Sequence, residues 1–332
     1  MFSVVLAAAI AFVVTISLGS EFIKFLQRKK FGQFVREEGP QTHLIKQGTP
    51  TMGGVVMLVG LASALLVVAR PNVATLTTLI LVSAVAGIGL YDDWQKISNR
   101  RNEGLRARYK ALFLILTVVV ADVMALRYVG ITQNLIIPGF DRNLVLGPGL
   151  IGVAFFSVVM LLVVVGTTNA VNLTDGLDGL AAGAGAIALL SYTAIAFLER
   201  QYDLAIICGA MVGAIIGFLW FNSHPAEVFM GDTGALAIGG VLAAAAVLTK
   251  TEMLLPIIGG IFVLETLSVM IQYVSFKLKK KRVFKMAPIH HHFELSGWEE
   301  NKVVMRFWII QSACAASGFV LYYFTLYNGA AI

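Results

Sequence analysis

Carboxylate side chains recur in the few polar motifs of this apolar chain. Asp92 and Asp93 are adjacent, Asp175 and Asp178 are three residues apart, and Asp232 follows further along. Adjacent carboxylates repel each other unless a proton or a cation offsets their charge. Mg²⁺ suits such a place, because it is a hard cation that takes carboxylate and phosphate oxygens. The aspartates therefore predict a centre that binds Mg²⁺ and acts on a phosphate.

Each motif also has a purely structural explanation. Asp92 and Asp93 could be the acidic start of an ordinary loop. Asp232 precedes an Ala- and Gly-rich apolar stretch, where a carboxylate could cap the N-terminus of a helix. The segment from Asn169 to Gly179 could be a loop rich in turn residues. Its two Asp and two Asn side chains have no Lys or Arg beside them, which favours a functional site.

Cationic and hydrogen-bonding side chains accompany the carboxylates. Lys46 precedes a Gly- and Thr-rich stretch, which could cradle phosphate at the start of a helix. His290, His291 and His292 are consecutive. Three consecutive histidines cannot all face one metal on a regular helix or strand, so a zinc site is disfavoured. As neutral donors or as cations they suit phosphate oxygens.

Apolar segments long enough to cross a bilayer separate these motifs. The chain has 332 residues, of which 58% are hydrophobic and 13% are charged, whereas a soluble domain is about a quarter charged. A helix of ~20 apolar residues spans the hydrocarbon core and satisfies its own backbone groups. We therefore expect an all-α polytopic membrane protein, a single integral membrane domain over residues 1–332 with about ten transmembrane helices. The expected spans are approximately 2–23, 52–69, 73–91, 111–129, 150–168, 180–198, 204–221, 233–249, 254–276 and 304–327.

The distribution of basic residues orients these spans. Alternation puts all the polar motifs on one side of the membrane. The other side holds only five of the 25 Lys and Arg residues, namely Arg70, Arg127, Arg142, Arg200 and Lys250. The positive-inside rule makes the motif side cytoplasmic and places both termini in the periplasm. Two short apolar runs within 131–149 flank a Pro-Gly pair and predict a small periplasmic β-hairpin between the fourth and fifth spans.

Several function classes fit less well. The net charge of +6 follows from the orientation, and no basic domain predicts a nucleic-acid partner. A transporter would carry its ionisable residues near the bilayer midplane, whereas here Asp122 and Glu265 are exceptions to clustering at one interface. An aspartyl intramembrane protease would pair Tyr91-Asp92 with Gly231-Asp232, but Phe229 stands where its Gly-x-Gly-Asp motif needs Gly.

Five motifs, spread over nearly the whole chain, resemble those of one enzyme family. They are Gly48–Gly54, Asp92–Lys96, Asn169–Gly179, Val228–Gly234 and Pro288–Glu294. The family is the polyprenyl-phosphate N-acetylhexosamine-1-phosphate transferases. The Pro-Ile-His-His-His-Phe-Glu motif is similar to that of the branch that acts on muramoyl-pentapeptide.

This resemblance implies a reaction. Undecaprenyl phosphate would attack the β-phosphorus of UDP-N-acetylmuramoyl-pentapeptide, with Mg²⁺ as cofactor. The products would be lipid I and UMP, in the first membrane step of peptidoglycan synthesis. The resemblance also implies a homodimer in the bacterial inner membrane with its active site on the cytoplasmic face. A sister enzyme that transfers N-acetylglucosamine-1-phosphate to the same lipid is the alternative, against which the histidine motif argues.

The resemblance also implies roles for individual residues. Asp232 would be the Mg²⁺ ligand, and Asp92 would engage or deprotonate the lipid phosphate with Asp93 beside it. Asn172 and Asp175 would complete the polar centre. The uridine pocket would comprise Lys46, Gly176, Leu177, Asp178, Asn222 and Phe229, with Phe229 stacked on uracil. Phosphates or the sugar-peptide portion would be held by Lys96, Lys110, His290, His291 and His292.

Elementary acid–base chemistry qualifies the role of Asp92. A phosphate monoester has a second pKa near ~6, so its dianion is already present at neutral pH. A strong general base is then unnecessary, and Asp92 would contribute more by electrostatic positioning than by proton removal. Direct displacement and a two-step route through a covalent aspartyl intermediate both remain compatible with the residues.

Overall fold

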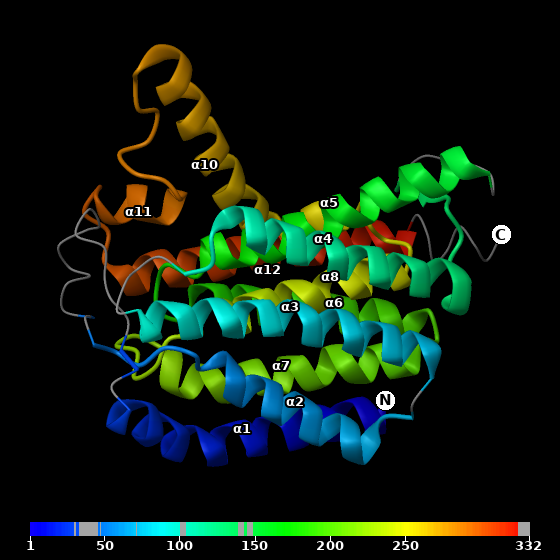
Figure 1. The fold of residues 1–332 in the computed structure, drawn as a ribbon, viewed down its shortest axis with the longest axis horizontal. Helices are drawn as coiled ribbons and strands as arrows, with labels where there is room; N and C mark the ends of the chain where they lie inside the picture. The colour runs from blue at the N-terminus through cyan, green and yellow to red at the C-terminus, as the bar shows by residue number, and fades with distance from the viewer. Residues whose placement is uncertain are drawn as a thin grey trace.

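Long apolar helices make up most of the structure (Figure 1). The computed structural model describes residues 1–29, 31–32, 46, 48–70, 72–99, 104–138, 143–144 and 149–324. The helices are α1 (Phe2–Arg28), α2 (Gly54–Val68), α3 (Val73–Ser98), α4 (Ala107–Met124), the π-helix η2 (Ala125–Val129), α5 (Leu150–Thr174), α6 (Leu180–Leu198), α7 (Tyr202–Asn222), α8 (Gly231–Leu248), α9 (Leu255–Ile258), α10 (Gly260–Lys279), α11 (Ile289–Glu294) and α12 (Glu300–Tyr322). The predicted all-α polytopic membrane fold is confirmed.

Nine helices of the described chain are long and apolar enough to cross a membrane, and the tenth expected span is shorter. That span, expected at 52–69, forms α2 with only 15 residues. The helix starts late because Met52 has a φ of 75° and the Gly53 N–H donates to the Phe229 carbonyl at 2.8 Å. The segment before α2 is therefore hydrogen-bonded to the loop that contains Phe229, and it does not continue the helix.

The ninth expected span, 254–276, is interrupted near its start. Gly259 leaves the helical conformation between α9 and α10. The side chain of Gln311 in α12 forms hydrogen bonds with the backbone groups that this break leaves unpaired. Its amide donates to the Ile258 carbonyl at 2.6 Å and accepts from the Ile261 N–H at 3.2 Å. A break inside a membrane is tolerated where a neighbouring helix satisfies the backbone in this way. Beyond it, α10 leans away from the other helices and α11 brings the chain back (Figure 1).

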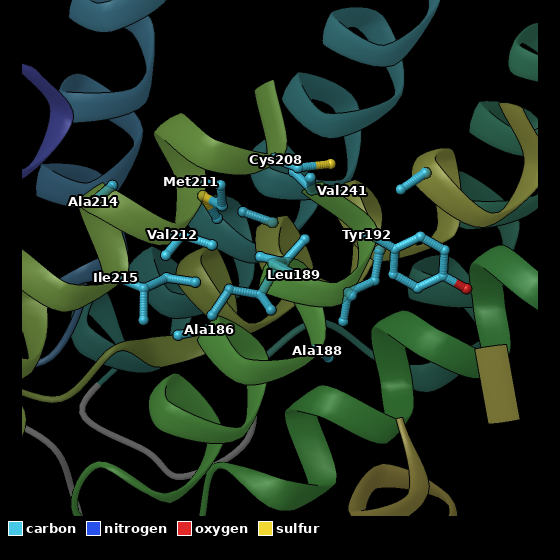
Figure 2. Close-up of a cluster of buried hydrophobic side chains, with 14 of the residues drawn as sticks. Ala186, Ala188, Leu189, Tyr192, Cys208, Met211, Val212, Ala214, Ile215 and Val241 are labelled. Atoms are coloured by element: carbon cyan, nitrogen blue, oxygen red, sulfur yellow. The ribbon is translucent and has the colours of Figure 1, made fainter. Parts of the chain in front are cut away.

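The centre of the bundle lies around α7 and α8. Almost every residue of α8 is buried, and Figure 2 shows side chains of α6 and α7, among them Leu189, Tyr192 and Met211, meeting Val241 of α8. Glycine and alanine let the helices approach closely, as is usual where van der Waals packing holds membrane helices together. A Cβ on Gly239 of α8 would lie only 2.6 Å from the Thr168 Cα of α5.

The expected hairpin segment contains the two strands of the described chain. Strand β1 (Leu135–Ile136) pairs antiparallel with β2 (Asn143–Leu144), with Leu135 opposite Leu144. Gly139 of the Pro-Gly pair lies outside the described residues. The side of the membrane that the hairpin faces stays a prediction.

Two ionisable side chains expected inside the spans have partners there. Ser157 of α5 donates to the Asp122 carboxylate of α4 at 2.5 Å. Glu265 of α10 lies 3.1 Å from the Nδ1 atom of His290, and both side chains are fully buried. Both pairs join neighbouring elements of the bundle, and ionisable groups inside membrane segments usually pair in this way.

Candidate active site

Three aspartates from two helices meet at one end of the bundle. Asp92 and Asp93 lie near the end of α3, and Asp232 lies in the first turn of α8. All three are buried, and one oxygen of each lies within 4.8 Å of the others. The close approach of α3 to α8 needs Gly89, because a Cβ there would collide with the Asp232 backbone. The packing of two helices thus concentrates three negative charges in one buried place.

Asp93 caps the N-terminus of α8 from the neighbouring helix. Its two oxygens accept the backbone N–H groups of Asp232 and Thr233, each at 3.0 Å, and the Thr233 hydroxyl at 2.7 Å. The first N–H groups of a helix have no partner within it, and a carboxylate there also suits the helix dipole. Sequence reasoning considered Asp232 as the cap, whereas the structure gives this role to Asp93.

Two lysines hold the carboxylates that do not cap a helix. The Lys96 ammonium lies 2.6 Å from Asp92 and 2.9 Å from Asp232. Lys110, at the start of α4, lies 2.5 Å from the other oxygen of Asp232. Asp92 also accepts the Leu105 N–H at 2.8 Å. Both cations lie at the reaction centre predicted from the aspartates.

The donor set of this aspartate–lysine centre fits Mg²⁺. Carboxylate oxygens are the ligands that this hard cation prefers, and no soft sulfur or imidazole donor belongs to the three-aspartate cluster. Asp92 and Asp232 are the better donors, because both oxygens of Asp93 are held by backbone N–H groups of α8, whereas the lysine side chains on Asp92 and Asp232 can move to phosphate oxygens. Two aspartates from the ends of different helices could therefore hold the ion.

Asp175 follows α5 and lies between this centre and a second polar cluster. Burial, together with the carboxylates of Asp232, Asp93 and Asp178, raises the pKa of Asp175 to about 8. Its N–H donates to the Asn172 carbonyl at 3.2 Å, and the side chain of Asn172 is half-buried. Asp175 therefore stays mainly protonated at neutral pH and adds little negative charge to the centre.

His290 supports the loop after Asp175. A Cβ on Gly176 would collide with the Nε2 atom of His290, and the Nδ1 atom of the same ring faces Glu265. Sequence reasoning placed His290 among the groups that contact substrate. In this structure its side chain is completely buried and lies against α10 and the loop, and its contact with substrate stays a prediction.

The three consecutive histidines have different surroundings because they lie on one helical turn. Successive side chains of a helix are about 100° apart. The Nδ1 atom of His291 lies 2.7 Å from Glu294, whereas that of His292 accepts the Lys285 N–H at 3.1 Å. The triplet is therefore not a single binding surface, and only His291 and His292 are partly accessible.

A second cluster joins four separate segments at the same end of the bundle. The Lys46 ammonium lies 2.7 Å from Asp178 and 2.5 Å from Glu300, the first residue of α12. The Nδ1 atom of His224 lies 2.9 Å from Asp178 and 3.4 Å from Glu300. The Ala226 N–H also donates to Asp178, at 3.1 Å. We call these four charged or titratable side chains the Lys46 cluster.

The loop between α7 and α8 is held in place by hydrogen bonds of the Asn222 side chain and of the Phe229 backbone. The buried Asn222 side chain accepts the Gly179 N–H at 3.1 Å and donates to the Val228 carbonyl at 2.9 Å. The Phe229 N–H donates to the Pro50 carbonyl at 2.8 Å, and its ring is half-buried. Leu177, by contrast, is buried in an apolar cluster that includes Phe307. Of these three predicted pocket residues, only Phe229 has a side chain that is partly accessible to a ligand.

Sequence reasoning did not assign Glu300, His224 or Glu265 to the site. Glu300 follows Glu299 just before the last expected span, 304–327, so it resembles an ordinary acidic residue that precedes a helix. His224 lies in the motif that contains Asn222 and Phe229, which was a usable signal. Glu265 is an ionisable residue within an apolar span, and such residues usually have a specific partner.

Comparisons with known proteins agree on one family. The model of glycosyl transferase family 4 matches residues 74–250, and the phospho-N-acetylmuramoyl-pentapeptide-transferase signature 1 matches residues 46–58. The phospho-N-acetylmuramoyl-pentapeptide-transferase of Rubrobacter xylanophilus is 76% identical over 99% of both chains. That of Geobacillus thermodenitrificans is 48% identical over 92% of this chain and 94% of the relative. The chain therefore belongs to the phospho-N-acetylmuramoyl-pentapeptide-transferase family.

Proposed function

We propose that the protein transfers phospho-N-acetylmuramoyl-pentapeptide from its UDP derivative to undecaprenyl phosphate, giving lipid I and UMP. The observation that carries this proposal is the proximity of the aspartate–lysine centre to the Lys46 cluster, with Asp175 and Asp178 on one loop between them. The names of the relatives and the matched signature support the same reaction.

The proposed reaction is a displacement at phosphorus. An oxygen of the lipid phosphate forms a bond to the β-phosphorus, and the bond from the β-phosphorus to the bridging oxygen breaks. The electron pair of that bond leaves with UMP. When bound, Mg²⁺ would neutralise negative charge on the phosphate oxygens. Lys96 and Lys110 would bind further phosphate oxygens, since both ammonium groups lie at the centre.

Asp92 would position the lipid phosphate and its counter-charges. Its carboxylate is fixed by Lys96 and by the Leu105 N–H. The phosphate dianion is already the main species at neutral pH, so Asp92 need not remove a proton. Asp93 would act indirectly, because it orients the first turn of α8 and with it Asp232.

The nucleotide would bind at the Lys46 cluster. Uracil offers one N–H donor between two carbonyl acceptors, which suits a carboxylate beside an ammonium group. Asp178 and Lys46 supply these two groups 2.7 Å apart. The Phe229 ring would stack on the base, while Asn222 and Gly179 hold the loop that carries it. His291 and His292 would contact the sugar-peptide or phosphate portion.

We further propose that the enzyme works in the bacterial inner membrane with this site on the cytoplasmic face. The excess of Lys and Arg in the motif loops supports this orientation. In Figure 1 the N-terminus lies at the opposite end of the bundle from α11, as the predicted alternation requires. The whole chain would act as one domain, and the family resemblance supports a homodimer.

Release of UMP by purified protein tests this function. The assay contains undecaprenyl phosphate and UDP-N-acetylmuramoyl-pentapeptide, with Mg²⁺ or with EDTA, and a parallel reaction contains UDP-N-acetylglucosamine. We expect Mg²⁺-dependent release with the muramoyl substrate alone. Release only with UDP-N-acetylglucosamine would move the protein to the sister reaction. No release from folded protein with either substrate would refute the proposal.

A further inference from the structure

We infer that Glu300 is a positioning residue of the proposed nucleotide subsite, which holds Lys46 and the Asp178 backbone in the geometry that receives a uridine nucleotide. The inference rests on the proposed function, because it takes the Lys46 cluster to be that subsite. No sequence motif points to Glu300, and the inference comes from its contacts.

Glu300 connects three segments that are far apart in sequence. One of its oxygens lies 2.5 Å from the Lys46 ammonium and accepts the Asp178 N–H at 2.9 Å. The other oxygen lies 3.4 Å from the Nδ1 atom of His224. The Glu300 side chain is 11% exposed, so water screens these contacts only weakly. Removing its charge should therefore alter the position of several groups at once.

The geometry of Lys46 shows what Glu300 contributes. An ammonium group has three N–H donors. Among the described residues, the oxygens of Asp178 and Glu300 take two of them. The third can then point to a carbonyl or phosphate oxygen of a ligand. Without Glu300, Lys46 would keep a single carboxylate partner and its long side chain would sample more rotamers. Ligand binding would then cost more conformational entropy, because it would have to order that side chain.

The location of Glu300 makes it a firm support. It is the first residue of α12, where a carboxylate is favoured by the helix dipole. Helix α12 packs against α6 through Trp308, whose ring nitrogen donates to the Leu180 carbonyl at 3.3 Å. Lys46, by contrast, belongs to none of the named helices, and its long side chain has many rotamers. The helix start therefore positions the lysine side chain, and not the reverse.

Binding of UMP to the purified full-length protein tests this inference without requiring turnover. Isothermal titration calorimetry in detergent would compare the original protein with Glu300→Gln, Lys46→Met and the double variant. Glu299→Gln is the matched control, because Glu299 is the adjacent carboxylate and is exposed. We expect Glu300→Gln to weaken UMP binding about tenfold, as for loss of one charge-assisted contact, and Glu299→Gln to leave it unchanged.

The double variant separates an indirect role from an independent one. If Glu300 acts through Lys46, the double variant should bind UMP about as weakly as Lys46→Met alone, since groups that act as a unit are not additive. In steady-state assays, Glu300→Gln should raise KM for the nucleotide substrate while KM for undecaprenyl phosphate and kcat stay nearly constant. Fully additive losses, or equal UMP binding by Glu300→Gln and Glu299→Gln, would overturn the inference.

Two outcomes keep this inference distinct from the proposed function. If the unaltered protein does not bind UMP, the nucleotide subsite itself is wrong. If it binds UMP but Glu300→Gln behaves like Glu299→Gln, only the role of Glu300 fails. Should Glu300→Gln not fold, Glu300→Asp keeps the charge at the start of α12 but withdraws it from Lys46. This variant should then show the same selective loss of nucleotide affinity.

Discussion

The aspartate–lysine centre and the Lys46 cluster contain the same kinds of side chain but are built differently. The first is made by the end of α3 and the starts of α4 and α8, and its three aspartates are all buried. The second is made by three loop segments and the start of α12, and its His224 is exposed. Helix ends hold charges at fixed positions suited to bond-making at phosphorus. Loops supported at one firm point can adapt to the shape of a nucleotide.

The comparison predicts that the largest effect on catalysis comes from the helix-built centre. Asp232→Asn should lower UMP release by about a thousandfold or more, the order seen when one preorganised electrostatic group is lost. Glu227→Gln, in the exposed loop before α8, is the control and should retain activity. The assay is UMP release over a range of Mg²⁺ concentrations. Near-normal turnover of Asp232→Asn at high Mg²⁺ would remove Asp232 from the metal site.

An intermediate effect is expected at the loop-built side of the site. Phe229→Ala should weaken UMP binding about tenfold, because stacking on an aromatic ring contributes on the order of 1–3 kcal/mol per base. KM for undecaprenyl phosphate should change little. Equal losses for nucleotide and lipid would instead indicate that the Phe229 ring supports the packing of the loop and does not stack on the base.

A smaller effect, on stability, should distinguish the two adjacent aspartates of α3. Asp93→Asn removes part of the cap of α8 and should lower stability by about 1 kcal/mol, seen as a lower apparent Tm in detergent. Asp92→Asn should lower UMP release strongly while leaving Tm closer to that of the original protein. If both substitutions lower Tm equally, the division between a capping aspartate and a phosphate-positioning aspartate is wrong.

The smallest expected effect concerns pH. The native pKa of Asp175 is raised from 3.8 to about 8, so the folded protein keeps a proton that the unfolded chain releases. This contribution to stability is complete below about pH 4 and is lost as the pH rises through about 8. In EDTA, Tm should therefore fall between pH 6 and pH 9. Asp175→Asn should reduce that fall by about 2–4 °C, and an unchanged slope would contradict the raised pKa of Asp175.

Sequence reasoning was most successful where one physical signal dominated. The ten apolar segments were predicted to be helices, and each coincides with one helix, except that 111–129 covers α4 and η2 and 254–276 covers α9 and α10. Residues 325–327 of the last segment lie outside the described residues. Hydrocarbon leaves the backbone few alternatives, so composition alone predicts such elements. The carboxylates were predicted from chemistry, because adjacent charges in an apolar chain need a counter-ion. The roles of neighbouring residues were harder to predict, as Asp92 and Asp93 illustrate.

The amino-acid sequence by itself determined the membrane fold, the family and the residue types of the centre, because hydropathy, charge asymmetry and motifs are local properties of the chain. Only the tertiary structure decided which aspartate caps α8, that His290 is buried against Glu265, and that Glu300 joins Lys46 to Asp178. These outcomes depend on which helix ends come within hydrogen-bonding distance. That distance is set by close packing at glycines such as Gly89 and Gly176, which no local pattern reveals.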